Sequence, residues 1–376
     1  MQIHRRDFLK RGLAAGALLS SAGALWTSCS GIRRDDLHTA PVADRTLAGL
    51  SKRHIAILSY ASLAPSGHNS QPWVVRVVRP DQWIIAADPA RRLPAVDPAS
   101  RELMLSLGAF AENLSLAAGT FGFRAHMDVM ATTSADRDVI VVRLEESKVV
   151  DYPLVRMQSR MTAKHGYRSD EIKPEDVAVL SAPLKDRLFY FARGTTHARC
   201  IEEGVVENFR IQSNRDAAQE ELVRWLRLSN AEAEQYRDGL TTESMEIRGL
   251  KGWFVRNFVN KADFLKAGYR RQGADLTAEL AQQGGGWFII TSHGNTVADW
   301  IDTGRRFQRL ALIARERRIA IHPMTQILEE EEGRQQFAQN HGSNIFPQFV
   351  LRVGYLSRYP EPVSLRRPVS WFVKAG

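Results

Sequence analysis

The residues best suited to chemistry lie together in one short segment of the 376-residue chain. Its small polar side chains can hydrogen-bond a ligand, and its proline restricts the backbone of a turn. The candidate ligand-binding residues of this segment are Pro65, Ser66, His68, Asn69 and Gln71. Such a loop suits a flat, polar cofactor. From this position the His68 side chain could reach the edge of the cofactor's ring or an anionic group on it. The alternative interpretation is an ordinary turn, with Ser and Asn as caps and His68 partly exposed.

Basic residues further along the chain form two more candidate groups. Arg160, Thr162 and Lys164 are two residues apart, so an extended backbone would point all three side chains to one side. Arg366 and Arg367 lie near the C-terminus. A phosphate group requires fixed positive charge and hydrogen-bond donors. Together with the polar loop, these groups predict phosphate binding by the first three residues and by one of the two C-terminal arginines. The alternatives are a basic surface strand and a solvated tail.

The polar loop must be positioned by a helix before it and a strand after it. Apolar residues at helical spacing from Ile55 to Ala61 predict the helix, and Val74–Val78 predicts the strand. Pro72 cannot donate a backbone hydrogen bond to a neighbouring strand, and Trp73 is expected to anchor the loop on the core.

Two longer stretches of the chain are similar to each other. Each contains a strand, a connection, an amphipathic helix starting at glycine, an apolar segment ending in histidine, and a further strand. The first stretch spans residues 83–144 and the second residues 287–353, with the helices starting at Gly108 and Gly304. This pattern favours an internal duplication.

The polar loop resembles the flavin-contacting loop of the nitroreductase family, whose motif is close to Ala-Pro-Ser-x-x-Asn-Ser-Gln-Pro-Trp. Residues 64–73 read Ala-Pro-Ser-Gly-His-Asn-Ser-Gln-Pro-Trp. Residues 160–164 are similar to the family's opening basic motif, and Arg366-Arg367-Pro368 is similar to its second phosphate-binding element. The resemblance implies FMN as the cofactor, with the loop on the flavin and the basic residues on the phosphate.

Nitroreductases are usually homodimers with flavins at the subunit interface. This chain carries the loop only in its first part and the opening basic motif only in its second, so it resembles the fused, Acg-like branch of the family. The resemblance implies an α+β fold with two tandem modules, at residues 46–152 and 153–376. Each module is expected to hold a mostly antiparallel sheet flanked by helices. The pseudo-dimer would have one complete flavin site and one degenerate site.

The family places a backbone donor to flavin N5 in the loop after a short strand that ends in proline. The corresponding loop here is Pro323-Met324-Thr325-Gln326. Thr325 and Gln326 stand where family members often have Glu-Gly, so Gln326 is a candidate side-chain donor to the ring.

The stretch from about residue 203 to 286 is the part least similar to the family. Residues 216–228 carry an apolar stripe that predicts a helix, and aromatic and basic residues alternate from 253 to 271. Three interpretations stay open: helices packed on the core with basic residues outside, a lid over the flavin, and a membrane-surface helix.

The N-terminus predicts a targeting segment. His4–Lys10 resembles the twin-arginine export motif, and a short apolar run, residues 12–26, follows it. We therefore expect a signal peptide over residues 1–30, a polar tether over residues 31–45 and an exported, periplasmic or extracytoplasmic protein. Cys29 is a candidate site for a lipid tether to the membrane, and simple cleavage near it is the alternative.

Composition limits the other functions. The net charge of +9 suits an anionic cofactor, but no arginine-rich tract indicates nucleic acid. Apart from Cys29 the sequence has one cysteine, Cys200, so we expect neither an internal disulfide nor a metal site. The run Glu329–Glu332 is interpreted as the solvated start of a helix.

The resemblance implies an FMN-dependent oxidoreductase in which NAD(P)H or another donor reduces the flavin. The acceptor would be a small aromatic compound such as a nitroaromatic or a quinone. No side chain is expected to act as a catalytic acid. The alternatives are a protein that binds or sequesters FMN with little turnover, and flavin chemistry such as reductive dehalogenation or flavin fragmentation.

Overall fold

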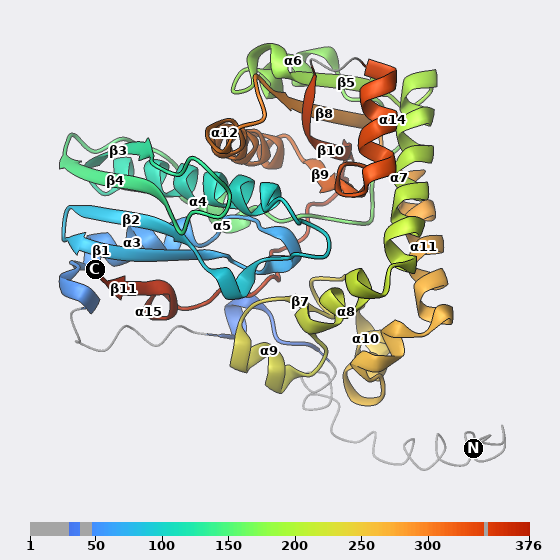
Figure 1. The fold of residues 1–376 in the computed structure, drawn as a ribbon, viewed down its shortest axis with the longest axis horizontal. Helices are drawn as coiled ribbons and strands as arrows, with labels where there is room; N and C mark the ends of the chain where they lie inside the picture. The colour runs from blue at the N-terminus through green and yellow to red at the C-terminus, as the bar shows by residue number, and fades with distance from the viewer. Residues whose placement is uncertain (1–29, 38–46, 342–344) are drawn as a thin grey trace.

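The computed structural model describes residues 30–37, 47–341 and 345–376 (Figure 1). The twin-arginine motif and Cys29 lie outside these residues, so the export signal and the lipid tether stay predictions. Within the described residues, no helix combines the length and the apolar character that crossing a membrane requires.

The first half of the chain builds a five-stranded sheet. Its strands are β1 (Trp73–Arg79), β2 (Gln82–Ala87), β3 (Phe123–Val129), β4 (Asp138–Glu146) and the C-terminal β11 (Val373–Ala375). They are ordered β11-β1-β2-β4-β3, and β11 runs parallel to β1 while the other neighbours are antiparallel. Helices α3 (Lys52–Ala61) and α4 (Arg101–Thr120) pack against each other beside this sheet. In β1 the alternating residues Trp73, Val75 and Val77 are buried, as the period of a strand requires.

The second half builds a four-stranded antiparallel sheet. Its strands are β5 (Leu188–Ala192), β8 (Gly286–Ser292), β9 (Ile319–Pro323) and β10 (Phe346–Tyr355). They are ordered β5-β8-β10-β9, and all seven residues of β8 are buried. Helices α6 (Pro174–Ser181) and α12 (Val297–Glu316) pack against each other on this side of the molecule. The α+β class with antiparallel-rich sheets flanked by helices is thereby confirmed.

The two halves share one strand order. In each, a helix is followed by two strands, a long helix and two more strands, giving β1-β2-β4-β3 in the first sheet and β5-β8-β10-β9 in the second. β1 and β2 are joined by a tight turn, whereas residues 193–285 separate β5 from β8. The extra segment therefore begins at residue 193, earlier than the predicted 203.

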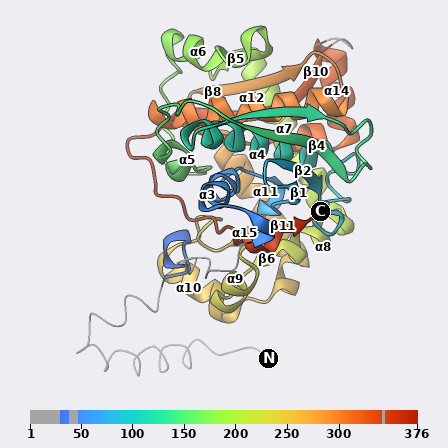
Figure 2. The same cartoon turned by 90° about the vertical axis from the view of Figure 1, so that its left-hand side faces the viewer.

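The halves meet where α4 and α12 pack against each other (Figure 2). A Cβ added at Gly108 of α4 would lie 2.2 Å from the carbonyl oxygen of Ile301 in α12. A Cβ added at Gly304 of α12 would lie 2.0 Å from the carbonyl oxygen of Leu105 in α4. Each glycine thus faces the residue three positions before the other glycine. The two backbones approach so closely that any side chain at either position would clash.

The extra segment supplies most of the remaining helices. They are α7 (Thr196–Asn214), α8 (Asp216–Trp225), α9 (Asn230–Tyr236), α10 (Gly249–Phe258) and α11 (Ala267–Ala281), with the short strands β6 (Leu226–Arg227) and β7 (Leu240–Thr241). Helices α7 and α11 pack side by side along one edge of the molecule in Figure 1. The helix predicted over 216–228 ends at Trp225, because the next two residues pair with β7. Of the basic residues expected outside, Arg256 is instead buried against Glu243.

Shorter elements complete the described chain. They are the helices α5 (Val155–Ser159), α13 (Gln326–Glu329), α14 (Glu331–His341) and α15 (Val369–Phe372), and the 3₁₀ turns η2 (Arg34–Asp36), η3 (Leu47–Gly49), η4 (Gly67–Asn69), η5 (Pro89–Arg91), η6 (Lys185–Arg187) and η7 (Lys261–Leu265). The chain returns from the second sheet through residues 356–368 to place α15 and β11 on the first. The C-terminal tail thereby ties the two halves together.

Candidate functional site

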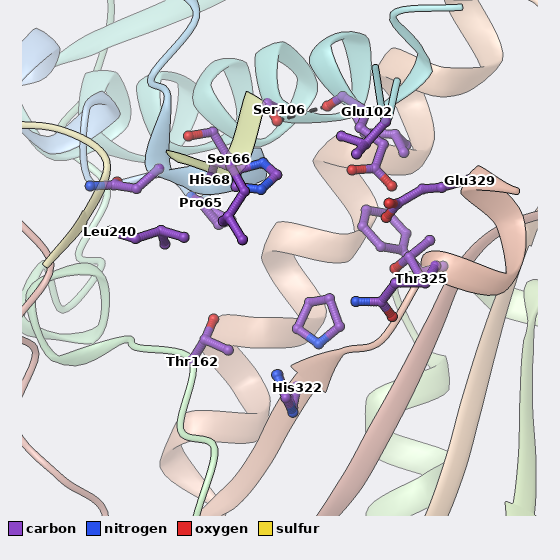
Figure 3. A pocket seen from close by; sticks show the side chains of 18 of the residues that line it. Pro65, Ser66, His68, Glu102, Ser106, Thr162, Leu240, His322, Thr325 and Glu329 are labelled. Atoms are coloured by element: carbon purple, nitrogen blue, oxygen red, sulfur yellow. Dashed lines mark hydrogen bonds between the residues drawn. The ribbon is translucent and has the colours of Figure 1, made fainter. Parts of the chain in front are cut away.

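A cavity of about 360 Å³ lies between the two halves, within the ~300–1,000 Å³ typical of small-molecule sites. Its walls come from three parts of the chain. The first half contributes Pro65–Asn69 and one face of α4, the extra segment contributes residues of α7 and α8, and the second half contributes residues 160–164 and the loop after β9. Figure 3 shows Ser66 and His68 on one side of the space, with Thr162 and His322 across from them.

The loop between α3 and β1 has an unusual backbone. His68, Asn69 and Gln71 have φ values of 49°, 52° and 51°, a region that non-glycine residues rarely adopt. The Ser66 hydroxyl accepts a hydrogen bond of 2.9 Å from the Gln71 amide, which closes the turn. Strained backbone of this kind persists where surrounding contacts hold it and is concentrated at functional sites.

Asn69 fastens this loop to the C-terminal tail. Its amide nitrogen donates to the carbonyl oxygens of Gly239 and Leu365 at 3.2 and 3.3 Å, and its Oδ1 accepts from Arg366 at 2.9 Å. The structure therefore gives Asn69 a positioning role at the edge of the cavity, since its side chain is committed to protein partners.

Arg160 carries the clearest signal for a ligand. Its side chain lines the cavity and is only 7% exposed, and its Nε has no hydrogen-bond partner. Among the described residues it forms no ion pair with any carboxylate, and burial lowers the pKa of its guanidinium, with Tyr359 opposing the shift. A buried cation without a counter-ion is costly, so this position calls for an anion.

Arg366 lies at the same end of the cavity. Its guanidinium donates to the carbonyl oxygens of Leu63 and Ala64, both at 3.2 Å, while its buried Nε has no partner. Burial, followed by the charges of Arg34 and Arg160, holds the pKa of Arg366 well below its usual value. Two guanidinium groups therefore adjoin here, and no ion pair with a carboxylate forms at either one within the described chain.

Lys164 and His68 both line the cavity, and the charge of Lys164 acts on the imidazole. Burial lowers the pKa of the Lys164 ammonium, and the charge of Glu246 opposes that shift. Burial and the charge of Lys164 lower the pKa of His68 to about 4, so the imidazole is neutral at physiological pH. A neutral imidazole can donate one hydrogen bond and accept another.

The loop after β9 also reaches the cavity. Thr325 and Gln326 both line it, and the Gln326 side-chain oxygen is buried without a hydrogen-bond partner. His322, at the end of β9, lines it as well, and burial lowers its pKa well below the usual value. The sequence analysis did not predict His322 as a site residue. The signal that could have identified it is the apolar segment ending in histidine, which both repeats contain.

Two predicted ligand-binding residues lie outside the cavity wall. Gln71 is fully buried, and its amide donates to the carbonyl oxygen of Arg237 at 2.9 Å and accepts from the Arg367 backbone at 2.9 Å. Arg367 is buried too, with its guanidinium donating to the carbonyl oxygens of Gln71 and Trp73. Both side chains join the tail to the start of β1, so we correct their assignment from ligand binding to structure.

A carboxyl pair was missed by the sequence analysis. Glu102 of α4 and Glu329 of α13 both line the cavity, and Figure 3 shows their carboxyl groups pointing toward one another. Burial, followed by the charge of Glu102, raises the pKa of Glu329 well above its usual value. Burial raises the pKa of Glu102 as well, against the opposing charge of Arg101. Glu329 is therefore not part of a solvated helix start, and the two neighbouring carboxyl groups resist losing both of their protons.

Part of the cavity wall is apolar. Phe307 and Phe349 stack with ring centroids 4.2 Å apart, and both line the cavity with Leu105 and Ala109 of α4. The cavity therefore offers cationic groups, a flat apolar wall and carboxyl groups with raised pKa values. Within the described residues, no cluster of His, Cys, Asp and Glu is suited to a metal ion.

No protein-family model and no curated protein matches this sequence. Solved structures show partial similarity to this chain. A nitroreductase-like family protein from Bacillus cereus has 8% identity and a TM-score of 0.36, covering 60% of this chain and 98% of its own. An FMN-dependent nitroreductase from Mycobacterium smegmatis, solved in complex with NADPH, has 14% identity and a TM-score of 0.37, covering 59% and 96%. A candidate nitroreductase from Anabaena variabilis has 10% identity and a TM-score of 0.39, covering 81% and 88%.

Proposed function

We propose that this chain binds FMN in the cavity between its halves and acts as an oxidoreductase of the nitroreductase type. The observation that carries the proposal is Arg160, a buried guanidinium at the cavity wall that has no carboxylate partner in the described part of the chain. A phosphate monoester supplies the missing negative charge and several acceptor oxygens.

The lining fits the rest of FMN as well. The flat apolar surface of Phe307, Phe349 and Leu105 suits an aromatic ring system. The unpartnered side-chain oxygen of Gln326 and the polar groups of the Ser66 loop would satisfy the ring edge and the ribityl hydroxyls. When bound, FMN supplies hydride transfer from a reduced donor to an acceptor.

The chain's own residues have three tasks in this proposal. Arg160 and Arg366 hold the phosphate, and residues of α7 and α8 cover the cavity and exclude water. Glu102 and Glu329 supply carboxyl groups with raised pKa values in the same cavity. This pair modifies our expectation that no side chain acts as an acid, because a carboxyl group with a raised pKa is better suited to donate a proton to a reduced acceptor.

Replacing both cavity arginines tests the site. We expect the Arg160→Ala, Arg366→Ala variant to lose FMN affinity by at least ~100-fold, since each hydrogen bond to a charged group contributes about 1.5–3 kcal/mol. Quenching of flavin fluorescence during titration gives the dissociation constant. Arg168→Ala is the matched control, because Arg168 is exposed, pairs with Asp170 and lies outside the cavity. Unchanged FMN affinity in the folded double variant would refute the site.

Reduction of the bound flavin under anaerobic conditions distinguishes a nicotinamide-dependent reductase from a protein that sequesters FMN. NADPH should bleach the bound flavin if the chain is a nicotinamide-dependent reductase that passes electrons to a nitroaromatic or a quinone. The contribution of α7 and α8 to the cavity favours the alternative that FMN is covered and turns over little. Bleaching by dithionite but not by NADPH or NADH would support that alternative or a different donor.

We also propose that the chain is an exported pseudo-dimer that arose by duplication. The common strand order and the reciprocal approach of Gly108 and Gly304 support the duplication. The Arg5-Arg6 motif supports export through the twin-arginine machinery, and Cys29 is the proposed lipid site. An Arg5→Lys, Arg6→Lys variant that reached the same cell fraction as the natural chain would contradict the export route.

A further inference from the structure

We infer that Arg34, which precedes both halves of the fold, is a third cation of the anion site formed by Arg160 and Arg366. The inference rests on the proposed binding of FMN and adds a residue that the polar loop and the two basic motifs do not include. It also changes the view of residues 31–37, which were predicted to be part of a free tether.

Arg34 joins the two segments that carry the other arginines. Its Nε donates to the carbonyl oxygen of Ser364 at 3.0 Å, and one terminal nitrogen donates to the carbonyl oxygen of Gln158 at 3.2 Å. Ser364 lines the cavity and lies two residues before Arg366, and Gln158 lies two residues before Arg160. The planar guanidinium therefore fixes these segments relative to one another.

The three guanidinium groups are close enough to affect each other. Burial, followed by the charge of Arg160, lowers the pKa of Arg34 to about 10, and Asp35 opposes the shift only in part. Arg34 and Arg160 in turn lower the pKa of Arg366. Arginine keeps its charge at physiological pH. Such a cluster is therefore unfavourable unless an anion lies among the three groups.

Arg34 is held by a segment that is built into the fold. The Gly31 amide donates to a Glu243 carboxylate oxygen at 3.0 Å, and the Ile32 amide donates to Asn230 at 3.3 Å. A Cβ added at Gly31 would lie 2.9 Å from Glu243, so the backbone approaches this carboxylate closely. Glu243 is almost fully buried and also pairs with Arg256. Residues 31–36 are thus fastened to the extra segment that contributes to the cavity wall, and the Arg34 side chain extends from there to the segments that carry Arg160 and Arg366.

The consequence is that the N-terminal segment contributes to cofactor retention. If residues before it are removed or attached to a membrane, the anion site keeps its third cation only while residues 31–36 stay docked. Phosphate recognition then depends on a part of the chain that lies outside both repeated halves.

A comparison of FMN with riboflavin isolates the charge effect, because riboflavin has the same ring but no phosphate. We expect Arg34→Gln to weaken FMN binding by about 10-fold, because one of three like charges near the phosphate is lost. Its affinity for riboflavin should change by less than about 2-fold, because the contacts with the ring are untouched. Arg34→Lys should restore most of the FMN affinity, because it keeps the charge. Flavin fluorescence quenching measures all dissociation constants, and circular dichroism confirms folding.

The possible failures have different signatures. A natural chain that binds neither flavin overturns the proposed function and this inference together. A natural chain that binds FMN, with Arg34→Gln binding it equally tightly, overturns the role of Arg34 alone. Equal losses for FMN and riboflavin would also overturn it, because they would show a purely structural effect. If Arg34→Gln does not fold, an Arg34→Lys variant with a ~10-fold or greater loss of FMN alone would contradict the charge argument.

Discussion

At the scale of single residues, the cavity is lined by two arginines and by a carboxyl pair from other elements. Arg160 and Arg366 have no carboxylate partner among the described residues, while the carboxyl groups of Glu102 and Glu329 point toward one another (Figure 3). Pairing these carboxyl groups with Arg160 and Arg366 would have formed salt bridges and left no charge for a ligand. The separate arrangement leaves an anion site and a carboxyl pair with raised pKa values in the same cavity.

The carboxyl pair predicts a pH-dependent stability. The pKa of Glu329 is raised in the folded state. Its contribution to folding stability is therefore fully present below the pKa of the unfolded chain, about 4.5, and is lost as pH rises through the pKa of the folded chain. Glu329→Gln removes the charge that must otherwise be buried. We expect flavin-free Glu329→Gln protein to melt roughly 2–4 °C above the natural chain at pH 8–9, with no gain near pH 4.5.

Thermal unfolding followed by circular dichroism at several pH values measures this difference. Glu220→Gln serves as the control, because Glu220 is exposed on α8 and lies outside the cavity wall. A melting temperature that differs from the natural chain by the same amount at every pH would contradict a raised pKa at Glu329.

At the scale of elements, the crossing of α4 and α12 determines whether the cavity exists. Ion pairs from Arg305 and Arg309 to the buried Glu112 and the hydrogen bond of 2.8 Å from Gln308 to Asn113 connect the same two helices. Because residues of both helices, Leu105 and Phe307 among them, line the cavity, a change in helix separation changes its width.

A methyl group added where α4 crosses α12 tests whether the cavity depends on the separation of these helices. Gly304→Ala would place its Cβ 2.0 Å from a backbone oxygen, which cannot move without shifting α4. We expect the free energy of unfolding to fall by about 1–3 kcal/mol or more, and FMN affinity to fall with it. Denaturant unfolding and flavin titration provide the two measurements.

Gly268→Ala is the matched helical control for that variant. Nothing lies within 4 Å of a Cβ added at Gly268 in α11, so alanine should leave stability unchanged or raise it by up to about 1 kcal/mol. Equal effects of the two substitutions would show that helix propensity, and not the close crossing, accounts for the change.

At the scale of the whole molecule, two halves with the same strand order differ in the connection that corresponds to the polar loop. The loop between α3 and β1 contains Ala64-Pro65 followed by η4, and the corresponding connection between α6 and β5 contains Ala182-Pro183 followed by η6. The second connection is shorter and carries Leu184–Arg187 in place of the Ser-Gly-His-Asn sequence. The cavity described above takes its loop from the first half alone.

This asymmetry predicts one FMN per chain. The second connection lacks the polar groups that face the flavin in our proposal, so we expect saturation at a molar ratio of one. Flavin absorbance after denaturation, compared with protein concentration from amino-acid analysis, gives the ratio. A ratio of two would contradict a single complete site.

The sequence by itself determined the elements beside the polar loop and part of the cavity wall. Apolar periodicity identified the helix before the polar loop and the strand after it, and the spacing of Arg160, Thr162 and Lys164 placed all three at the cavity. These features are local, because hydrophobic period and turn residues act over a few neighbours.

Only the tertiary structure decided which polar residues are available to a ligand. The Arg367 backbone donates to the Gln71 side chain across 296 positions of sequence, whereas the Arg160 Nε has no hydrogen-bond partner among the described residues. The carboxyl pair likewise joins Glu102 to Glu329, and the Arg34 side chain donates hydrogen bonds to carbonyl oxygens 124 and 330 positions away. Whether a buried polar group is satisfied depends on what the folded chain brings beside it, and no local pattern records that.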